Sequence, residues 1–355
     1  MAHIGILYGD EEKKGGIRAY SHMLGDVLKS QGHQITYLSF ASLHSPFYKS
    51  PTSSWRELLL TYQLGTMADY ISPQYDLIIG NGYYGAFCKH SPLTIYHFVY
   101  PSYVKYLGES PLKGIVGGYL EKKAGKDKLR LSVSQFLAHE VTKYYGYNTI
   151  VIPNGVDISI FHKLSSNAKK SLYAKWNVQA DKPTIAFVGR WNKRKGADVV
   201  EYVAEHLPYV QILAVLGYGT IKESIAPNIT VFSQLNHTEI NEIYNLADIV
   251  LYPSRYEPFG YVTAEGWSAG TPVITTPMGL GYEIKHHPIL GKFVISDMEH
   301  IKNETLNIVK WYLNLDEGER HDISNEGMAY IRKHYSIDTW ANNMHEVINY
   351  LLSTR

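Results

Sequence analysis

The sequence has almost none of the residues that build disulfide frameworks or thiolate metal sites. Of its 355 residues one is a cysteine, Cys88, so neither an intrachain disulfide nor a metal site made of several cysteines can form. It also has no apolar run of the roughly 18 residues that a membrane-spanning helix needs. The opening residues turn polar after Tyr8, with no basic segment ahead of the apolar one, so we expect no ordinary secretory signal. These absences favour a cytoplasmic protein.

The sequence also has almost no excess of positive over negative charge. The formal net charge is +1, which gives the whole molecule no nucleic-acid signal, and we expect no nucleic-acid partner. Two motifs are missing: the G-x-G-x-x-G of dinucleotide sites, and the Asp-x-Asp with which many transferases hold a divalent cation. What remains is a globular composition, 45% hydrophobic and 19% charged. A chain of this length exceeds one ordinary core, so we expect two domains.

The most informative stretch runs from Asp248 to Glu283. Its apolar start, 249–252, has the length and β-branched content of a buried parallel strand. A turn ending in Gly260 follows, and glycine allows a ligand to approach the backbone closely. Residues 261–269 then predict a helix and 272–276 a second short strand. The order is therefore strand, acidic turn, helix, strand.

Two carboxylates flank the start of this predicted helix. Glu257 lies just before it and Glu265 lies one to two turns inside it. A helix start offers unpaired N–H groups and a positive dipole end, which suit a phosphate. Carboxylates would repel that phosphate, but they accept hydrogen bonds from hydroxyls of a sugar or ribose. The stretch therefore predicts a ligand that is both phosphorylated and polyhydroxylated.

A second strand–loop–helix unit carries positive charge. The predicted strand 183–188 leads into Gly-Arg-Trp-Asn-Lys-Arg-Lys-Gly, residues 189–196, and then into a predicted helix at 197–206. Cations concentrated between a parallel strand and a helix favour a diphosphate. The alternative is a solvated basic loop.

The first unit of the chain has the same order. A strand at 4–8, the pair Gly15-Gly16 and a helix from Ile17 leave backbone N–H groups free to meet an anion, although a plain turn explains the pair equally well. Farther on, His97 ends the predicted strand 93–96, where open α/β sheets bind ligands. The alternative for His97 is a half-buried loop histidine.

Together these motifs resemble those of the retaining, nucleotide-sugar-dependent glycosyltransferases of the GT-B type, family 4 (glycosyl transferases group 1). The resemblance covers most of the chain. It depends on the Gly-Gly loop, Ile-Pro-Asn-Gly-Val-Asp at 152–157, Gly-Arg-x4-Lys-Gly at 189–196, and the Glu-x7-Glu pair. It implies an α/β fold of two Rossmann-like, doubly wound domains facing across a cleft. We expect an acceptor domain at 1–165 with a crossover helix at 337–355, and a donor domain at 166–336.

The resemblance also implies roles for individual residues. Arg190 and Lys195 would hold the donor's two phosphates, Glu257 the hydroxyls of the moving sugar, and Glu265 those of the ribose. His97 would reach the transferred sugar. The expected catalytic residues are His97, Arg190, Lys195 and Glu257. The expected donor-binding residues are Gly15, Gly16, Arg190, Lys195, Glu257, Pro258, Phe259, Gly260, Tyr261, Val262 and Glu265.

The implied reaction moves a hexosyl group from a UDP-, GDP- or ADP-sugar to a hydroxyl of a glycan, lipid or small molecule. Family 4 retains configuration by a front-face route that needs no protein nucleophile. We expect no metal and no other cofactor, because cations and helix N–H groups can neutralise the leaving diphosphate. Two alternatives remain open: a sugar-nucleotide 2-epimerase of the same fold, and a non-catalytic sugar-nucleotide or glycan-binding protein.

The segment 103–130 is rich in lysine and arginine and poor in acids. A solvated helical face and loop is one interpretation. The other is a surface for an anionic acceptor or for anionic lipid head groups. In that case the protein would lie peripherally on the cytoplasmic face of a membrane.

Overall fold

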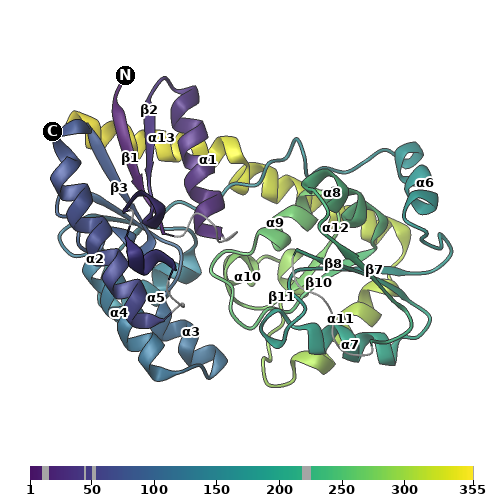
Figure 1. Ribbon diagram of the computed structural model, residues 1–355. Helices are drawn as coiled ribbons and strands as arrows, with labels where there is room; N and C mark the ends of the chain where they lie inside the picture. Colours follow the sequence, from purple (N-terminus) through teal and green to yellow (C-terminus); the bar gives the residue numbers. More distant parts are fainter. Residues whose placement is uncertain (10–15, 44, 50–52, 218–224, 355) are drawn as a thin grey trace. The chain divides into compact units, whose positions relative to one another are not determined.

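The computed structural model describes residues 1–9, 16–43, 45–49, 53–217 and 225–354. They form two α/β units (Figure 1). The N-terminal unit comprises 1–153 together with 340–355, and the C-terminal unit comprises 154–339. Within the described residues, no helix has the length and apolar content to cross a bilayer.

The N-terminal unit is built on a parallel sheet of order β2-β1-β3-β4-β5-β6. Its strands are apolar, and β1, β3 and β4 are almost wholly buried, as expected for a sheet covered on both faces. The strands are β1 (His3–Leu7), β2 (Gln34–Leu38), β3 (Leu77–Asn81), β4 (Leu93–Tyr96), β5 (Leu129–Ser132) and β6 (Ile150–Val151). The α-helices are α1 (Gly16–Ser30), α2 (Ser54–Ile71), α3 (Tyr100–Leu107), α4 (Pro111–Ala124) and α5 (Gln135–Tyr145).

The C-terminal unit has a parallel sheet of order β11-β10-β7-β8-β9. The strands are β7 (Thr184–Val188), β8 (Gln211–Leu216), β9 (Ile229–Ser233), β10 (Ile249–Tyr252) and β11 (Val273–Thr275). The α-helices are α6 (Ser166–Lys175), α7 (Ala197–His206), α8 (His237–Leu246), α9 (Tyr261–Ser268), α10 (Leu280–Ile284), α11 (Ile301–Leu313) and α12 (Glu317–Tyr335).

In both sheets the strand order reverses beside the first strand of the unit. The N-terminal chain runs from β1 out to β2 and then returns to the other side of β1 as β3. In the same way the C-terminal chain runs outward through β8 and β9 and returns beside β7 as β10. The loops that leave such a pair of strands at their carboxyl ends diverge and open a crevice for ligands. Each unit therefore has one topologically favoured ligand edge.

The last helix, α13 (Ile337–Ser353), lies with the N-terminal unit from Trp340 onward. Its buried residues recur at helical spacing: Trp340, Met344, Ile348 and Leu351. The Trp340 ring meets Tyr20 of α1 edge to face, with ring centroids 5.5 Å apart. Burial of this apolar stripe fixes α13 on the N-terminal unit.

The first boundary lies earlier than the predicted 165/166. Residues 154–165 pack on the C-terminal unit: Val156 N donates to Tyr335 O at 2.7 Å, and His162 N donates to Asn241 Oδ1 at 3.1 Å. The polar segment that follows forms α6, with Ser165 Oγ accepting from Ala168 N at 3.3 Å as its cap. Polar composition hid this helix because α6 buries only Leu172.

The basic segment 103–130 covers most of α3, all of α4, the turn after it and the start of β5, with Lys105, Lys122 and Lys126 exposed. Gly108, in the left-handed conformation (φ 64°), separates the two helices. The two helices contact each other, and α4 also contacts α2.

Candidate functional site

The loop that follows β7 is held in shape by its own residues. Asn192 Oδ1 accepts from Lys195 N at 3.0 Å, which closes a short turn, and Gly196 follows in the left-handed conformation (φ 83°). A Cβ on Gly196 would lie 2.5 Å from the carbonyl oxygen of Pro253. Glycine is therefore required for the loop after β7 to lie against the loop after β10.

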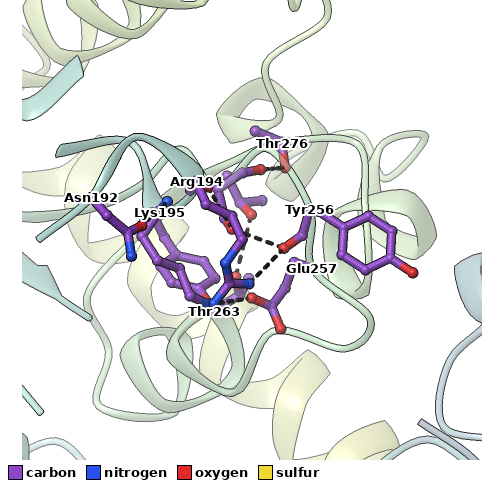
Figure 2. Close-up of polar contacts among 10 residues, drawn as sticks. Asn192, Arg194, Lys195, Tyr256, Glu257, Thr263 and Thr276 are labelled. Carbon is purple, nitrogen blue, oxygen red and sulfur yellow. Dashed lines mark hydrogen bonds and ion pairs between the residues drawn. The ribbon is translucent and has the colours of Figure 1, made fainter. Parts of the chain in front are cut away.

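Lys195 and Glu257 form an ion pair at this edge of the sheet (Figure 2). Lys195 Nζ lies 2.6 Å from Glu257 Oε2 and donates to the hydroxyl oxygen of Tyr252, the last residue of β10. The Tyr252 hydroxyl in turn donates to Glu257 Oε2. Only about 15% of either charged side chain is exposed. The two predicted site residues are thus brought into direct contact, and Tyr252 joins them.

The charges of this pair are set by burial and by its neighbours. Burial lowers the pKa of Lys195, and the positive charges of Arg194 and Arg190 lower it further, while Glu257 opposes them. Burial would raise the pKa of Glu257, but the Lys195 ammonium and the Tyr252 hydroxyl hold it below its usual value. Glu257 is therefore a carboxylate near neutral pH, fixed in place before any ligand arrives.

Two arginines complete the positive cluster. Arg190 is exposed, and its charge acts on Lys195. Arg194 is half-buried, and its Nη1 donates to the carbonyl oxygen of Tyr256 at 3.4 Å (Figure 2). Sequence reasoning assigned Arg194 no role, although its charge affects both members of the ion pair.

A second ion pair, between Arg255 and Asp198, joins the loop after β10 to the start of α7, which follows the β7 loop. Arg255 donates to both carboxylate oxygens of Asp198 in α7, at 2.8 and 2.9 Å, and its main-chain N donates to Arg194 O at 2.8 Å. A two-pronged arginine–carboxylate contact fixes orientation as well as distance. Arg255 and Asp198 were not predicted, and they hold the β7 loop against the β10 loop.

The Pro258–Val262 segment leads into α9. Gly260 takes the left-handed conformation (φ 97°), and the helix begins at the next residue. Phe259 and Gly260 are buried, whereas Pro258, Tyr261 and Val262 are half-buried. Thr263 N and Ala264 N donate to Gly260 O at 3.0 and 3.3 Å, and the positive dipole end of the helix at this start favours an anion.

The loop after β11 packs on this turn. Leu280 N donates to Phe259 O at 2.5 Å, and a Cβ on Gly279 (φ 53°) would lie 2.2 Å from that same oxygen. Gly279 therefore permits the close approach of two main-chain segments, and the turn before α9 is fixed from both sides.

Glu265 differs from Glu257 in its electrostatics. Its carboxyl accepts from the hydroxyl of Tyr244 in α8 at 2.9 Å. Burial raises the pKa of Glu265 to about 7, and the hydrogen bond from Tyr244 offsets part of that effect. The two glutamates that look alike in the sequence thus carry different charges near neutral pH, because the cation lies beside Glu257.

In the N-terminal unit, Gly16 begins α1, and Gly15 lies outside the described residues. Among the described residues, a Cβ on Gly16 would meet no heavy atom within 4 Å, so contacts with that part of the chain do not require glycine there.

His97 is buried and belongs to a short chain of hydrogen bonds. Its Nε2 contacts Asn81 Oδ1, and Asn81 Nδ2 donates to Ser21 Oγ at 2.5 Å. Ser21 Oγ donates its own proton to Ile17 O of α1 at 2.8 Å, so it must accept from Asn81. Asn81 then presents its oxygen to His97, and His97 Nε2 is the protonated nitrogen. Nδ1 is left as an acceptor.

The charge of His97 agrees with this tautomer. Burial lowers the pKa of His97 to about 3, so the ring is neutral at physiological pH. Tyr20 packs against the ring with centroids 4.5 Å apart. Ser21 and Asn81 were not predicted. Asn81 ends β3 on the ligand edge, a position that could have identified it from the sequence, whereas Ser21 needed the tertiary contact.

Two family models match the chain. The model for glycosyl transferases group 1 matches residues 169–294, and that for glycosyltransferase family 4 matches residues 14–160. An uncharacterized glycosyltransferase of Methanocaldococcus jannaschii is 28% identical over 244 residues, 62% of this chain and 58% of that protein. A D-inositol 3-phosphate glycosyltransferase of Xylanimonas cellulosilytica is 30% identical over 186 residues, 47% of this chain and 44% of that protein. The chain spans about half the length of these curated relatives.

Solved structures share the fold over the whole chain. Sucrose-phosphate synthase from Thermosynechococcus elongatus has a TM-score of 0.80 at 18% identity, covering 100% of both chains. Anabaena HepE, solved in complex with UDP and glucose, has a TM-score of 0.75 at 18% identity, covering 98% of this chain and 100% of its own. At such identities the likeness concerns the fold.

Proposed function

Because this chain belongs to the GT-B glycosyltransferases of group 1, we propose that it transfers a hexosyl group from a nucleoside-diphosphate sugar to an acceptor hydroxyl. The observation that carries the proposal is the cradle at the β7–β10 edge. There, a fixed ammonium–carboxylate pair, two further cations and a helix start lie on adjoining loops. The structural neighbour HepE, solved in complex with UDP and glucose, supports a nucleotide donor.

The positive groups act on the leaving diphosphate. When the bond between the sugar C1 and the phosphate oxygen breaks, negative charge grows on the β-phosphate. Arg190, Lys195 and the first N–H groups of α9 stabilise that charge. Lys195 is already held by Glu257 and Tyr252, so little reorganisation accompanies the reaction, and the stabilisation favours the transition state.

The carboxylates take the hydroxyls of the donor. Glu257 is ionised and accepts from hydroxyls of the moving sugar, next to the phosphates that Lys195 binds. Glu265, on the second turn of α9, accepts from the ribose hydroxyls and becomes fully ionised as they bind. His97 accepts a hydrogen bond from a further sugar hydroxyl at Nδ1. That nitrogen is unprotonated because the ring proton lies on Nε2, which contacts Asn81.

The transfer retains configuration by a front-face route. The acceptor oxygen bonds to C1 on the side from which the diphosphate leaves, and the acceptor proton passes to the departing phosphate oxygen. No protein nucleophile is needed, and the cations replace a bound metal. The acceptor is a hydroxyl of a glycan, a lipid or a small molecule.

The test is turnover of labelled UDP-, GDP- and ADP-hexoses in the presence of a chelator, with and without a panel of acceptors. We expect acceptor-dependent release of the nucleoside diphosphate from one donor class. Conversion of the donor sugar without acceptor would instead show an epimerase. Binding without turnover of any donor, or activity lost with the chelator and restored by Mg²⁺, would contradict the proposal.

A further inference from the structure

Two neighbouring helices of the N-terminal unit, α2 and α4, each expose large apolar side chains along one face. Along α2, Trp55 and Tyr62 lie two turns apart on one face, and Trp55 is 70% exposed. Along α4, an exposed stripe with helical spacing consists of Leu112, Ile115 and Tyr119, and Ile115 is 67% exposed. By contrast, Trp267 and Trp340 are fully buried. Large apolar residues exposed on adjacent helices are the mark of an interaction surface.

The two stripes meet at an apolar hollow. α2 and α4 pack side by side (Figure 1), and a cavity of about 540 Å³ opens beside them. Its lining is Trp55, Leu58, Leu59, Tyr62, Phe87 and Tyr119. We define the α2–α4 face as this lining together with Leu112, Ile115, Lys122 and Lys126.

Positive charge continues from the apolar stripe. Lys122 continues the exposed row of α4 beyond Tyr119, and Lys126 lies in the turn that follows the end of the helix at Ala124; both lysines are exposed. A neighbouring hollow shares Tyr62 and Phe87 with the apolar one, and its charged lining includes Lys89, Lys123, Lys126 and Lys128. Lys123 Nζ lies 5.0 Å from the centre of the Phe87 ring. Apolar and cationic surfaces are thus contiguous.

The acids nearby are mostly engaged within the protein. Asp69 accepts from His90 N at 3.0 Å and from Cys88 Sγ at 3.4 Å, and Glu57 accepts from Tyr83 at 3.2 Å. Asp127 is exposed beside the lysines and removes one unit of their charge. The lysines around the two hollows still outnumber the acids, so the face has net positive charge beside its apolar stripe, which favours an anionic partner.

We propose that the α2–α4 face binds the surface of an anionic lipid bilayer. Tryptophan and tyrosine favour the level of the lipid head groups, Leu112 and Ile115 can enter the acyl boundary, and lysines attract lipid phosphates. A second copy of the chain is a poorer occupant, because self-association would bring the same lysine clusters of both copies to one interface. This surface belongs to the N-terminal unit and the β7–β10 cradle to the C-terminal unit, and the test of the surface does not depend on the proposed function.

Sedimentation with vesicles tests the proposal. Wild-type protein is expected to bind phosphatidylcholine vesicles containing 30% phosphatidylglycerol at least tenfold more tightly than pure phosphatidylcholine vesicles. Trp55→Ser with Ile115→Ser is expected to weaken binding at least tenfold, because the inserted side chains are lost. Lys122→Glu with Lys126→Glu is expected to abolish the preference for anionic vesicles.

Matched controls distinguish this face from the rest of the surface. Tyr209→Ser and Tyr350→Ser remove exposed aromatic residues elsewhere, and Lys310→Glu reverses an exposed lysine of α11. These variants are expected to bind as the wild type does, and circular dichroism with thermal melting checks that all variants fold. Equal binding to both vesicle types, no binding, or a dimer in sedimentation velocity that Trp55→Ser with Ile115→Ser dissociates would overturn the proposal.

Discussion

The ligand edges of the two units share a topology and differ in chemistry. Both lie where the strand order reverses, between β1 and β3 in one unit and between β7 and β10 in the other. The C-terminal edge gathers ions, with Lys195 against Glu257. The N-terminal edge gathers neutral groups, with His97 against Asn81. The same topology thus carries an ionic edge in one unit and a neutral edge in the other, set by the side chains at the strand ends, and we propose that the first binds phosphates and the second hydroxyls.

The largest effect on the difference between the two edges is expected when the Lys195 ammonium is removed from the C-terminal edge. Lys195→Ala is expected to lower kcat/KM for the donor by about 10²–10³-fold, because the growing charge on the β-phosphate loses a fixed cation and Glu257 loses its partner. Lys193→Ala is the matched control, since Lys193 is exposed in the same turn. Steady-state kinetics measure kcat/KM for the donor in both variants. Equal losses would mean that general positive charge suffices.

Glu265 tests whether the second carboxylate serves binding. Glu265→Ala is expected to weaken donor affinity by about 10–100-fold, as for the loss of a hydrogen bond to a charged group, with a smaller effect on kcat. Titration calorimetry with the nucleotide sugar measures it. A large fall in kcat at unchanged donor affinity would place Glu265 in the chemistry instead.

Neutrality of the N-terminal edge can be tested at Asn81. Asn81→Leu leaves His97 Nε2 without an acceptor, so the ring can take the other tautomer, and we expect about a tenfold rise in donor KM. Asn81→Asp keeps an acceptor and is expected to restore much of the affinity. Its carboxylate would raise the pKa of His97 and add a new acid limb to the pH profile. Nitrogen-15 spectra of the histidines report the tautomer directly, and an unchanged tautomer in Asn81→Leu would refute the hydrogen-bond chain.

Changing the pH should alter donor binding less than the substitutions above do, and this pH dependence should come from Glu265. Its pKa of about 7 lies above that of a free glutamate, and ribose hydroxyls favour the ionised form, so binding releases a proton below pH 7. Donor affinity is therefore expected to rise between pH 5.5 and 7, by no more than about tenfold per pH unit, and to level off above 8. Glu265→Gln should flatten this profile. A profile that falls as pH rises would contradict the assignment.

The smallest effect is expected for the contact between Arg255 and Asp198. Arg255→Ala should lower kcat/KM about threefold to tenfold and reduce thermal stability slightly, because the β7 loop loses one of its fixings to the β10 loop. Asp198→Asn, which keeps the size of the side chain, should act in the same direction. Additive losses in the double variant would show that the two residues act independently.

Much of the fold could be predicted from the sequence, because apolar strands and capped helices are local signals. The predicted and observed bounds agree for β4, α7 and β10. The helix α6 was missed because its polar sequence gave no periodic signal. At the candidate site, Lys195 and Glu257 could be named from the sequence because each follows a buried strand in a recognisable motif, and the structure brings the two into an ion pair.

The partners of these residues could not be predicted. Tyr252, Tyr244 and Arg255 are ordinary residues in the sequence, and they become part of the site only through contacts between segments that are distant along the chain. The different pKa values of Glu257 and Glu265 also depend on tertiary structure, since one carboxyl has an ammonium beside it and the other has a phenol.

The central claim is that the C-terminal edge holds a diphosphate with its own cations. Titration calorimetry of UDP, GDP and ADP into the full chain, with a chelator present, tests it most directly. We expect one of these nucleotides to bind with at least micromolar affinity to the wild type and at least tenfold more weakly to Lys195→Ala. Equal affinity for both proteins, or binding that appears only when Mg²⁺ is added, would contradict the account.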